Sequence, residues 1–144
     1  MIDITKKPNT EREAIAKCEI IMKEETLKLI KEDKIEKGNV FEVAKTAGIL
    51  STKYTPFLIP FTHPILITSV KIEFSELKDP KGIEIQVKVK SIGKTGVEME
   101  ALTAAAISAL TIYDMCKGFD KTMIISNLRL VKKTGGKSGD FARE

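Results

Sequence analysis

The segment from residue 96 to residue 117 constrains the fold more than any other part of the chain. It predicts one long helix that carries Ala, Leu and Ile on nearly every face, and a helix that is apolar all round packs in the middle of something larger than one small domain. Its few charges are Glu98 and Glu100 near the start and Asp114 and Lys117 near the end. Because such charges are costly to bury unless they are paired or used, the segment predicts a site built around a central, oligomer-buried helix.

The spacing of these charges predicts how the site is assembled. Glu100 and Asp114 are nearly four helical turns apart, so they lie on much the same face but about 21 Å from each other. One small substrate is too short to contact both side chains of the same subunit. If both serve one site, two copies of the helix must run antiparallel across a two-fold interface. Asp114 and Lys117 can form an i,i+3 pair, which is either an ion pair at the helix end or part of the site.

The start of the helix carries the capping-box pattern Thr95-x-x-Glu98, which gives Glu98 a structural explanation. Glu100 has no such explanation, because it lies one turn into a helix otherwise filled with Ala, Leu and Ile. Residues two apart on a helix point about 200° from each other. Glu98 and Glu100 are therefore not an acid/base pair on one face.

Length and composition narrow the class of protein. A chain of 144 residues predicts a single domain over residues 1–144. No run approaches the roughly 20 apolar residues of a membrane span, and the N-terminus lacks a signal-peptide core, so we expect a cytoplasmic protein without a membrane partner. Cys18 and Cys116 lie far apart and His63 is the only histidine, which leaves too few ligands for a metal site.

The order of predicted elements indicates the fold. Alternating apolar residues predict a first strand. A charged helix and then a second helix follow this strand. A proline-rich segment after them predicts a stiff loop without regular helix. Two alternating runs predict an antiparallel hairpin, and the central helix, a last strand and a mobile tail complete the chain. The order predicts an α+β domain, a ferredoxin-like antiparallel sheet with helices on one face plus additional helices. The ranges are 12–22, 23–33, 40–54 (with Val43, Ala44, Ala47 and Leu50 on one face), 56–64, 66–74, 83–89, 96–117, 123–132 and the tail from about 134.

Several polar side chains outside the helix are candidate site residues. His63 is either structural or an acid/base or substrate donor, and its position between Pro60 and Pro64 favours a function, because catalysis needs rigid positioning. Arg12 is either a solvated surface arginine or a bidentate phosphate ligand. Lys137 lies in a Gly-rich tail that fails the Walker A spacing but has backbone amides that could fold over a phosphate.

A series of motifs then matches one known family along essentially the whole chain. The chain resembles the MoaC family of molybdenum-cofactor biosynthesis. The resemblance rests on Lys37-Gly-Asn-Val, Ala47-Gly48, Lys53-x-Thr55, Leu58-Ile-Pro-x-x-His-Pro64, Thr95-Gly-Val-Glu-Met-Glu-Ala-Leu-Thr103, Tyr113-Asp-Met-Cys-Lys117 and Gly135-Gly-Lys-Ser-Gly-Asp-Phe141, with Ile2-Asp-Ile-Thr-x-Lys7 and Thr10-x-Arg12 at the start.

The resemblance implies an activity and an assembly. The family converts (8S)-3′,8-cyclo-7,8-dihydroguanosine 5′-triphosphate, which a radical SAM partner makes from GTP, into cyclic pyranopterin monophosphate with release of pyrophosphate. It assembles as a hexamer, a trimer of dimers, with active sites at the dimer interfaces. No cofactor is implied, although Mg²⁺ could accompany the triphosphate, and no nucleic acid partner is expected.

The resemblance also implies roles for individual residues. Asp114, Lys117 and Lys53 match the catalytic positions of the family. The implied substrate-binding positions are Phe61, Thr62, His63, Met99 and Glu100, with Glu98 close by and with the basic residues Arg12 and Lys137.

The chain departs from the family's pattern at three positions, where Thr62 replaces a usual Cys, Asn39 replaces a common Asp and Tyr54 replaces a common Arg. Three other readings compete with the synthase: a basic ferredoxin-like protein that binds nucleotides or RNA without catalysis, a non-catalytic oligomeric scaffold, and acyl transfer by Cys116 with His63. Against RNA binding, only 6% of residues are aromatic and none is Trp, so the stacking platform of an RNA-binding sheet is missing.

Overall fold

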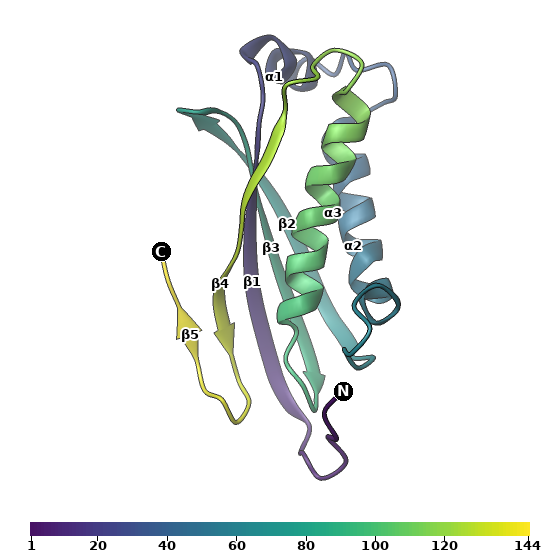
Figure 1. Cartoon of the computed structure of the whole chain (residues 1–144), viewed down its shortest axis with the longest axis vertical. Helices are drawn as coiled ribbons and strands as arrows, with labels where there is room; N and C mark the ends of the chain where they lie inside the picture. The colour runs from purple at the N-terminus through teal and green to yellow at the C-terminus, as the bar shows by residue number, and fades with distance from the viewer.

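The computed structural model describes residues 1–144 as one five-stranded antiparallel sheet with two long helices on one face (Figure 1). The strands are ordered β2-β3-β1-β4-β5 across the sheet. The elements are β1 (Thr10–Ile21), α1 (Glu24–Lys31), α2 (Val40–Leu58), β2 (Leu66–Lys78), β3 (Lys81–Gly93), α3 (Glu98–Cys116), β4 (Ile124–Thr134) and β5 (Phe141–Ala142). The predicted α+β class, the element order and the β2–β3 hairpin are confirmed.

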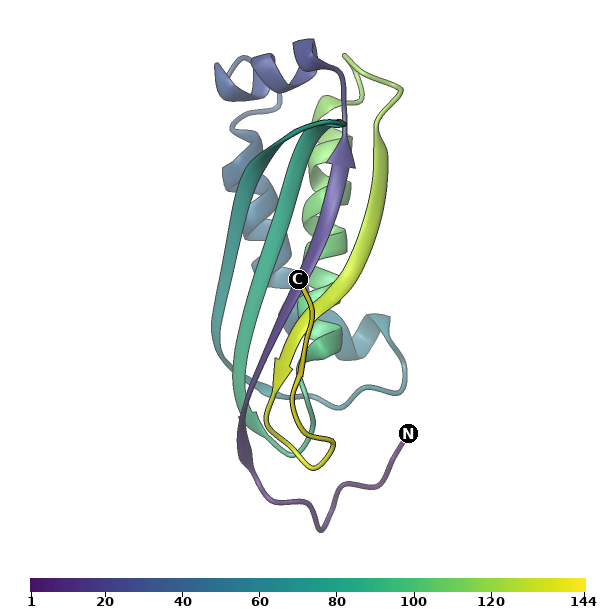
Figure 2. The ribbon, with the colours of Figure 1, turned by 90° about the vertical axis from the view of Figure 1, so that its left-hand side faces the viewer.

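The core lies between the sheet and α3, and small side chains bring the two layers close together. Ala14, Ala16 and Cys18 of β1 are completely buried, as are several alanines of α3. Figure 2 shows α2 and α3 lying behind the sheet, while the opposite face of the sheet is open. On that open face ion pairs link neighbouring strands, as where Arg129 of β4 approaches Glu19 of β1 at 3.8 Å. The alternation of apolar and charged residues along the strands reflects one buried and one wet face.

The packed face of α2 matches the predicted one at Ala44, which is completely buried, but differs from it at Val43 and Leu50. Val43 and Leu50 are 42% and 51% exposed, whereas the buried side is built largely from small residues such as Ala44 and Gly48. A Cβ added to Gly48 would collide with the Ser108 hydroxyl of α3, and that hydroxyl donates to the Ala44 carbonyl oxygen at 3.0 Å. The two helices approach so closely that only small residues fit between them, and the larger apolar side chains of α2 point away.

Two predicted helix ends are wrong. Helix α2 continues through Pro56 to Leu58 instead of ending before the prolines, because a proline in the last turn removes only one backbone donor and the preceding Thr55 is fully buried. At the start of α3, Thr95 is not the cap, since the N-cap position is Val97 and no side chain caps it.

The tail folds back on the sheet. Strand β5 pairs with β4, with Phe141 opposite Lys133, and the connecting turn contains Gly135, Gly136 and Gly139 with positive φ angles. The predicted mobility of this tail stays a prediction. None of the helices is long and apolar enough to serve as a membrane span.

Candidate active site

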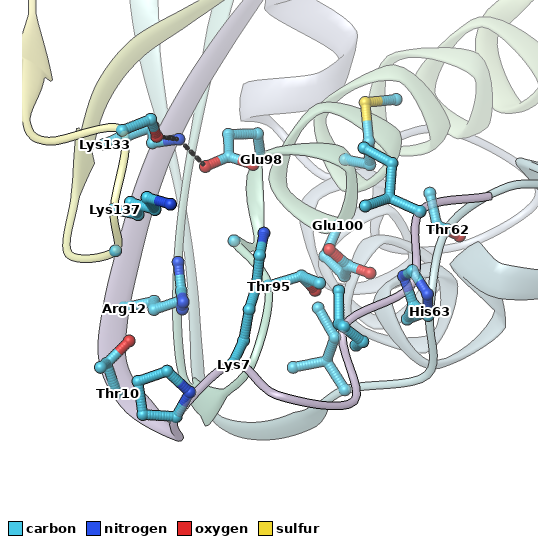
Figure 3. A pocket seen from close by; sticks show the side chains of 18 of the residues that line it. Lys7, Thr10, Arg12, Thr62, His63, Thr95, Glu98, Glu100, Lys133 and Lys137 are labelled. Carbon is cyan, nitrogen blue, oxygen red and sulfur yellow. Dashed lines mark hydrogen bonds and ion pairs between the residues drawn. The ribbon is translucent and has the colours of Figure 1, made fainter.

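A cavity of about 830 Å³ opens at the end of the molecule where α3 begins. Five segments that are distant in sequence form it: residues before β1, the start of β1, the α2–β2 loop, the first turn of α3 and the tail (Figure 3). It brings together all eight side chains predicted to bind substrate. These are Arg12, Phe61, Thr62, His63, Glu98, Met99, Glu100 and Lys137.

One wall of the cavity is basic. Arg12 is held in place because its Nε donates to the Gly93 carbonyl oxygen at 3.1 Å, and the glycine backbone of the tail lies against its guanidinium. A Cβ at Gly136 would collide with Arg12 Nη1, so only glycine allows this approach. Lys133 also lines the wall and pairs with Glu98 at 3.2 Å. Glu98 therefore bridges to β4 instead of capping its own helix.

Glu100 is the acidic group of the opposite wall. Its side chain is only 2% exposed, it lines the cavity, and Figure 3 shows its carboxylate on the side of the cavity away from Lys133 and Lys137. Burial raises the pKa of this carboxyl, the backbone amide of Glu100 opposes the shift and the charge of Glu98 adds to it, so that the pKa is about 7. Glu100 can therefore both hold and release a proton near neutral pH, as a general acid or base requires.

The α2–β2 loop supplies the remaining predicted contacts. The Thr62 hydroxyl donates to the Ile59 carbonyl oxygen at 2.9 Å and so stabilises the loop itself. Thr62 stands where the family usually has Cys, and this hydrogen bond gives the substitution a structural role. His63 and Phe61 line the cavity beside it. Phe61 is 75% exposed at the mouth of the loop.

A second cluster lies at the other end of α3, away from the cavity. Lys37, from the α1–α2 connection, donates to the Asp114 carboxylate at 3.1 Å and to the Asp114 carbonyl oxygen at 3.0 Å. Lys117 approaches the same carboxylate at 3.4 Å, which confirms the predicted i,i+3 pair. Hydrogen bonds from Lys37 and then from Lys117 hold the pKa of the Asp114 carboxyl below its ordinary value.

The three predicted catalytic residues are not brought together in one chain. Asp114 and Lys117 contact each other. Lys53 is exposed on α2 and makes no ion pair or hydrogen bond with either of them. None of the three lines the cavity. Sequence reasoning missed Lys37 as a site residue, although the motif Lys37-Gly-Asn-Val had drawn attention to it. It also missed Lys133, whose approach to the cavity depends on how β4 pairs with β1.

The cysteine alternative finds no support in the geometry. Cys116 is completely buried, and burial, together with the charge of Asp120, raises the pKa of its thiol to about 11. A buried thiol with such a pKa carries almost no thiolate and is a poor nucleophile. His63 lies at the opposite end of α3, on the wall of the cavity.

Comparisons with known proteins show to which family the sequence is similar. The sequence model of the MoaC family matches residues 1–136. A protein from Desulforamulus reducens is 56% identical over 144 residues, which cover 100% of this chain and 87% of the relative. Relatives from Thermoanaerobacter sp. (strain X514) and Desulfitobacterium hafniense are 53% and 54% identical, with 100% of this chain and 91% and 88% of the relatives covered. Each of these relatives is named cyclic pyranopterin monophosphate synthase.

Proposed function

The chain belongs to the MoaC family, and we propose that its cavity carries out the synthesis after which its relatives are named, with (8S)-3′,8-cyclo-7,8-dihydroguanosine 5′-triphosphate as the substrate. The chain is accordingly a lyase of molybdenum cofactor biosynthesis. A radical SAM enzyme that rearranges GTP supplies this substrate, and pyrophosphate leaves with the product. The observation that carries the proposal is the convergence of eight family-matched side chains on one cavity.

The basic wall of the cavity suits the triphosphate group of such a substrate. Arg12, Lys133 and Lys137 line the basic wall, and charge-assisted hydrogen bonds from such groups bind phosphate oxygens and stabilise the charge that develops as pyrophosphate leaves. Any Mg²⁺ that accompanies the triphosphate would take its ligands from the phosphate oxygens and from water.

Rearrangement of the base requires protons to be delivered and removed at several atoms. Glu100 has a pKa of about 7, and His63 lines the same cavity, so both can serve ring atoms of a bound substrate. We assign the other acid/base group to Asp114, Lys117 and Lys37, in which one carboxylate contacts two ammonium groups. In this assignment Lys37 takes the place that the family resemblance gives to Lys53.

The two parts of the site lie at opposite ends of α3, so we propose that each complete site takes its cavity from one subunit and its Asp114 cluster from another. Two α3 helices that run antiparallel across a two-fold axis would place the end of one beside the start of the other. Exposed apolar side chains on the outer side of the helices support this assembly, because exposed patches of this kind mark interfaces. They include Leu50, Tyr54 and Phe57 of α2 and Leu110 of α3. Three such dimers would form the hexamer that the family resemblance implies.

The direct test is turnover of the cyclic dihydro-GTP substrate, measured as pyrophosphate release and pterin formation. The wild type should be active, and Lys117→Ala should lose activity while sedimentation shows an unchanged assembly. If the wild type neither turns over the substrate nor binds it, the proposed function is wrong for this chain.

A complementation experiment tests the shared site separately. Arg12→Ala removes a group of the cavity and Lys117→Ala a group of the second cluster, so each variant alone should be inactive. After the two are unfolded together and refolded, mixed dimers should hold one intact site each, which restores about a quarter of the wild-type sites. A mixture that stays inactive, although mass spectrometry shows mixed dimers, would place all catalytic groups in one subunit.

A further inference from the structure

We propose that Arg129 and Glu144 form a clasp that positions the tail of the chain at the cavity, so that both are positioning residues for substrate binding. The clasp is the pair of these two side chains on the open face of the sheet, and neither of them lines the cavity. The inference rests on the proposed function, because its effect is on the binding of substrate. Figure 2 shows the segment after β5 in front of the sheet, while the turn before β5 lies at the end of the molecule where α3 begins and the cavity opens.

The clasp is a bidentate ion pair. Arg129 Nε and Nη2 donate to the two carboxylate oxygens of Glu144, at 2.6 and 2.5 Å. Two parallel hydrogen bonds of this kind fix the orientation of the partners as well as the distance between them. The Arg129 side chain is only 13% exposed, so water and salt screen this pair less than they screen an ordinary surface pair.

Arg129 is itself fixed in the sheet. Its Nη1 donates to the Asn127 carbonyl oxygen at 2.9 Å. Its guanidinium approaches Glu19 of β1 at 3.8 Å and, across β1, Glu84 of β3 at 3.5 Å. Because these partners belong to the central strands of the sheet, Arg129 is a fixed point to which Glu144 attaches the segment after β5.

The tail has few other bonds to the body of the protein. Strand β5 has only two residues, and so short a ladder is marginal by itself. In the turn, the Gly135 amide donates to the Asp140 carboxylate at 3.1 Å and the Gly139 amide to the Gly136 carbonyl oxygen at 3.3 Å, so these bonds join the turn to itself. After β5, Arg143 donates to two carbonyl oxygens of β4, at 2.8 and 2.7 Å. The clasp adds a charged contact to this short attachment.

The tail carries two groups of the cavity wall. Lys137 lines the cavity, and Gly136 lies so close to the Arg12 guanidinium that a Cβ would collide with it. Both lie in a turn with three glycines at positive φ, and glycine backbone has more conformations open to it than that of other residues. Without the clasp, the turn should leave the cavity in a fraction of the molecules. The apparent affinity for substrate then falls with the fraction that keeps the competent arrangement.

The first experiment measures kcat and KM for the cyclic dihydro-GTP substrate in Glu144→Gln, which removes the charge and keeps the size of the side chain. We expect KM to rise about fivefold, as for the loss of an ion pair at the upper end of the range for surface pairs. The value of kcat should be unchanged, because saturating substrate selects the competent arrangement of the tail. Glu144→Asp, which keeps the charge, should recover most of the loss.

Glu73→Gln is the matched control. Glu73 also pairs with a lysine, Lys71, at 3.4 Å, but it lies on β2, at the edge of the sheet opposite to β5. Loss of a negative charge from the chain as a whole affects both variants equally. Glu73→Gln should therefore keep the KM of the wild type.

Hydrogen exchange with millisecond labelling follows the tail in the absence of substrate. In Glu144→Gln the backbone amides of residues 139–143 should exchange faster than in the wild type. Those of β1 and α3 should exchange as in the wild type, because the sheet and its helices do not depend on the tail.

Three results bear against the inference or against the function on which it rests. Equal KM values in Glu144→Gln and Glu73→Gln, with an active wild type, would overturn the inference, and so would unchanged exchange in the tail. Faster exchange throughout the sheet, together with a lower kcat, would show that the pair stabilises the whole fold instead of positioning the tail. An inactive wild type whose tail still exchanges faster in Glu144→Gln would contradict the proposed function and leave the clasp standing.

Discussion

Lys37 and Asp114 are joined twice, because the Lys37 ammonium donates to both the carboxylate and the backbone carbonyl oxygen of Asp114, at 3.1 and 3.0 Å. Lys117 contacts the other carboxylate oxygen at 3.4 Å. One carboxylate therefore orients two lysines that come from different parts of the chain. Such a set can hold one ammonium in place while the other exchanges a proton with a substrate.

Removal of Lys37 should be as damaging as removal of a general acid or base. We expect Lys37→Met to lower kcat by about 100-fold or more, with little change in thermal stability, because the pair with Asp114 is exposed. Lys45→Met, on the exposed side of α2, controls for the loss of a lysine. Lys53→Met tests the alternative assignment from the family resemblance, in which Lys53 and not Lys37 is the catalytic lysine. If Lys53→Met loses activity and Lys37→Met keeps it, the assignment of Lys37 is wrong.

The buried Glu100 should make the protein less stable as the pH rises. Burial raises its pKa from 4.5 to about 7, so between these pH values the folded chain binds more protons than the unfolded chain, and unfolding becomes easier as the pH increases. We expect Glu100→Gln to gain stability relative to the wild type between about pH 5 and pH 8, on the order of 2 kcal/mol. Urea unfolding at both pH values measures this. Glu25→Gln, at an exposed carboxylate of α1, should show no such gain.

The tail glycines permit a comparison in which backbone strain cancels. Gly136 and Gly139 both have positive φ, at +85° and +79°, but only at Gly136 would a Cβ meet Arg12. Alanine at either position should cost roughly 1 kcal/mol of stability through strain. Gly136→Ala should additionally displace the guanidinium and raise KM about tenfold, as for a lost charge-assisted bond. Steady-state kinetics on both variants check this, and equal KM values would show that Arg12 does not depend on the glycine.

Asp120 should act as an acid-sensitive clamp between the start of α1 and the α3–β4 connection. It is 1% exposed, and its carboxylate accepts from the Lys23 amide, the Thr26 hydroxyl and both donors of Thr122. Burial raises its pKa, but these hydrogen bonds outweigh burial and lower it to about 2.

The carboxylate of Asp120 thus contributes stability above its ordinary pKa and loses it as the pH falls towards 2. We expect Asp120→Asn to lose about 2–3 kcal/mol near neutral pH, because its amide places donors against donors. The deficit should shrink in acid, as followed by circular dichroism during denaturation. A deficit that does not change with pH would assign the effect to packing instead.

The sequence predicted those parts of the fold that depend on local periodicity. Alternation along β1 and β3 predicts strands with one buried face, and the apolar run of α3 predicts a buried helix. The predicted packed face of α2 was wrong at Val43 and Leu50, because periodicity rules look for large apolar residues, whereas the contact with α3 uses Gly48 and Ser108. The capping box failed for a different reason: Glu98 finds its partner in Lys133, which is distant in sequence and invisible to a local motif.

The candidate site could be predicted only in part. Its eight substrate-binding positions followed from a resemblance, and the structure brings them together on one cavity. Lys7 and Lys133 reach the same cavity because of chain geometry: the pairing of Glu13 with Thr134 in the sheet places the tail beside the start of β1. No composition or spacing rule reports such a pairing, so these residues emerged only from the folded chain.

The central position of β1 also has a consequence for how the protein is made. This strand is synthesised first, yet both of its neighbours, β3 and β4, come later in the chain. A growing chain must therefore carry β1 with two unpaired edges until most of the protein has left the ribosome, a state that is open to aggregation. The cavity takes residues from before β1 and from after Thr134, so a chain that stops before the tail lacks part of the cavity wall.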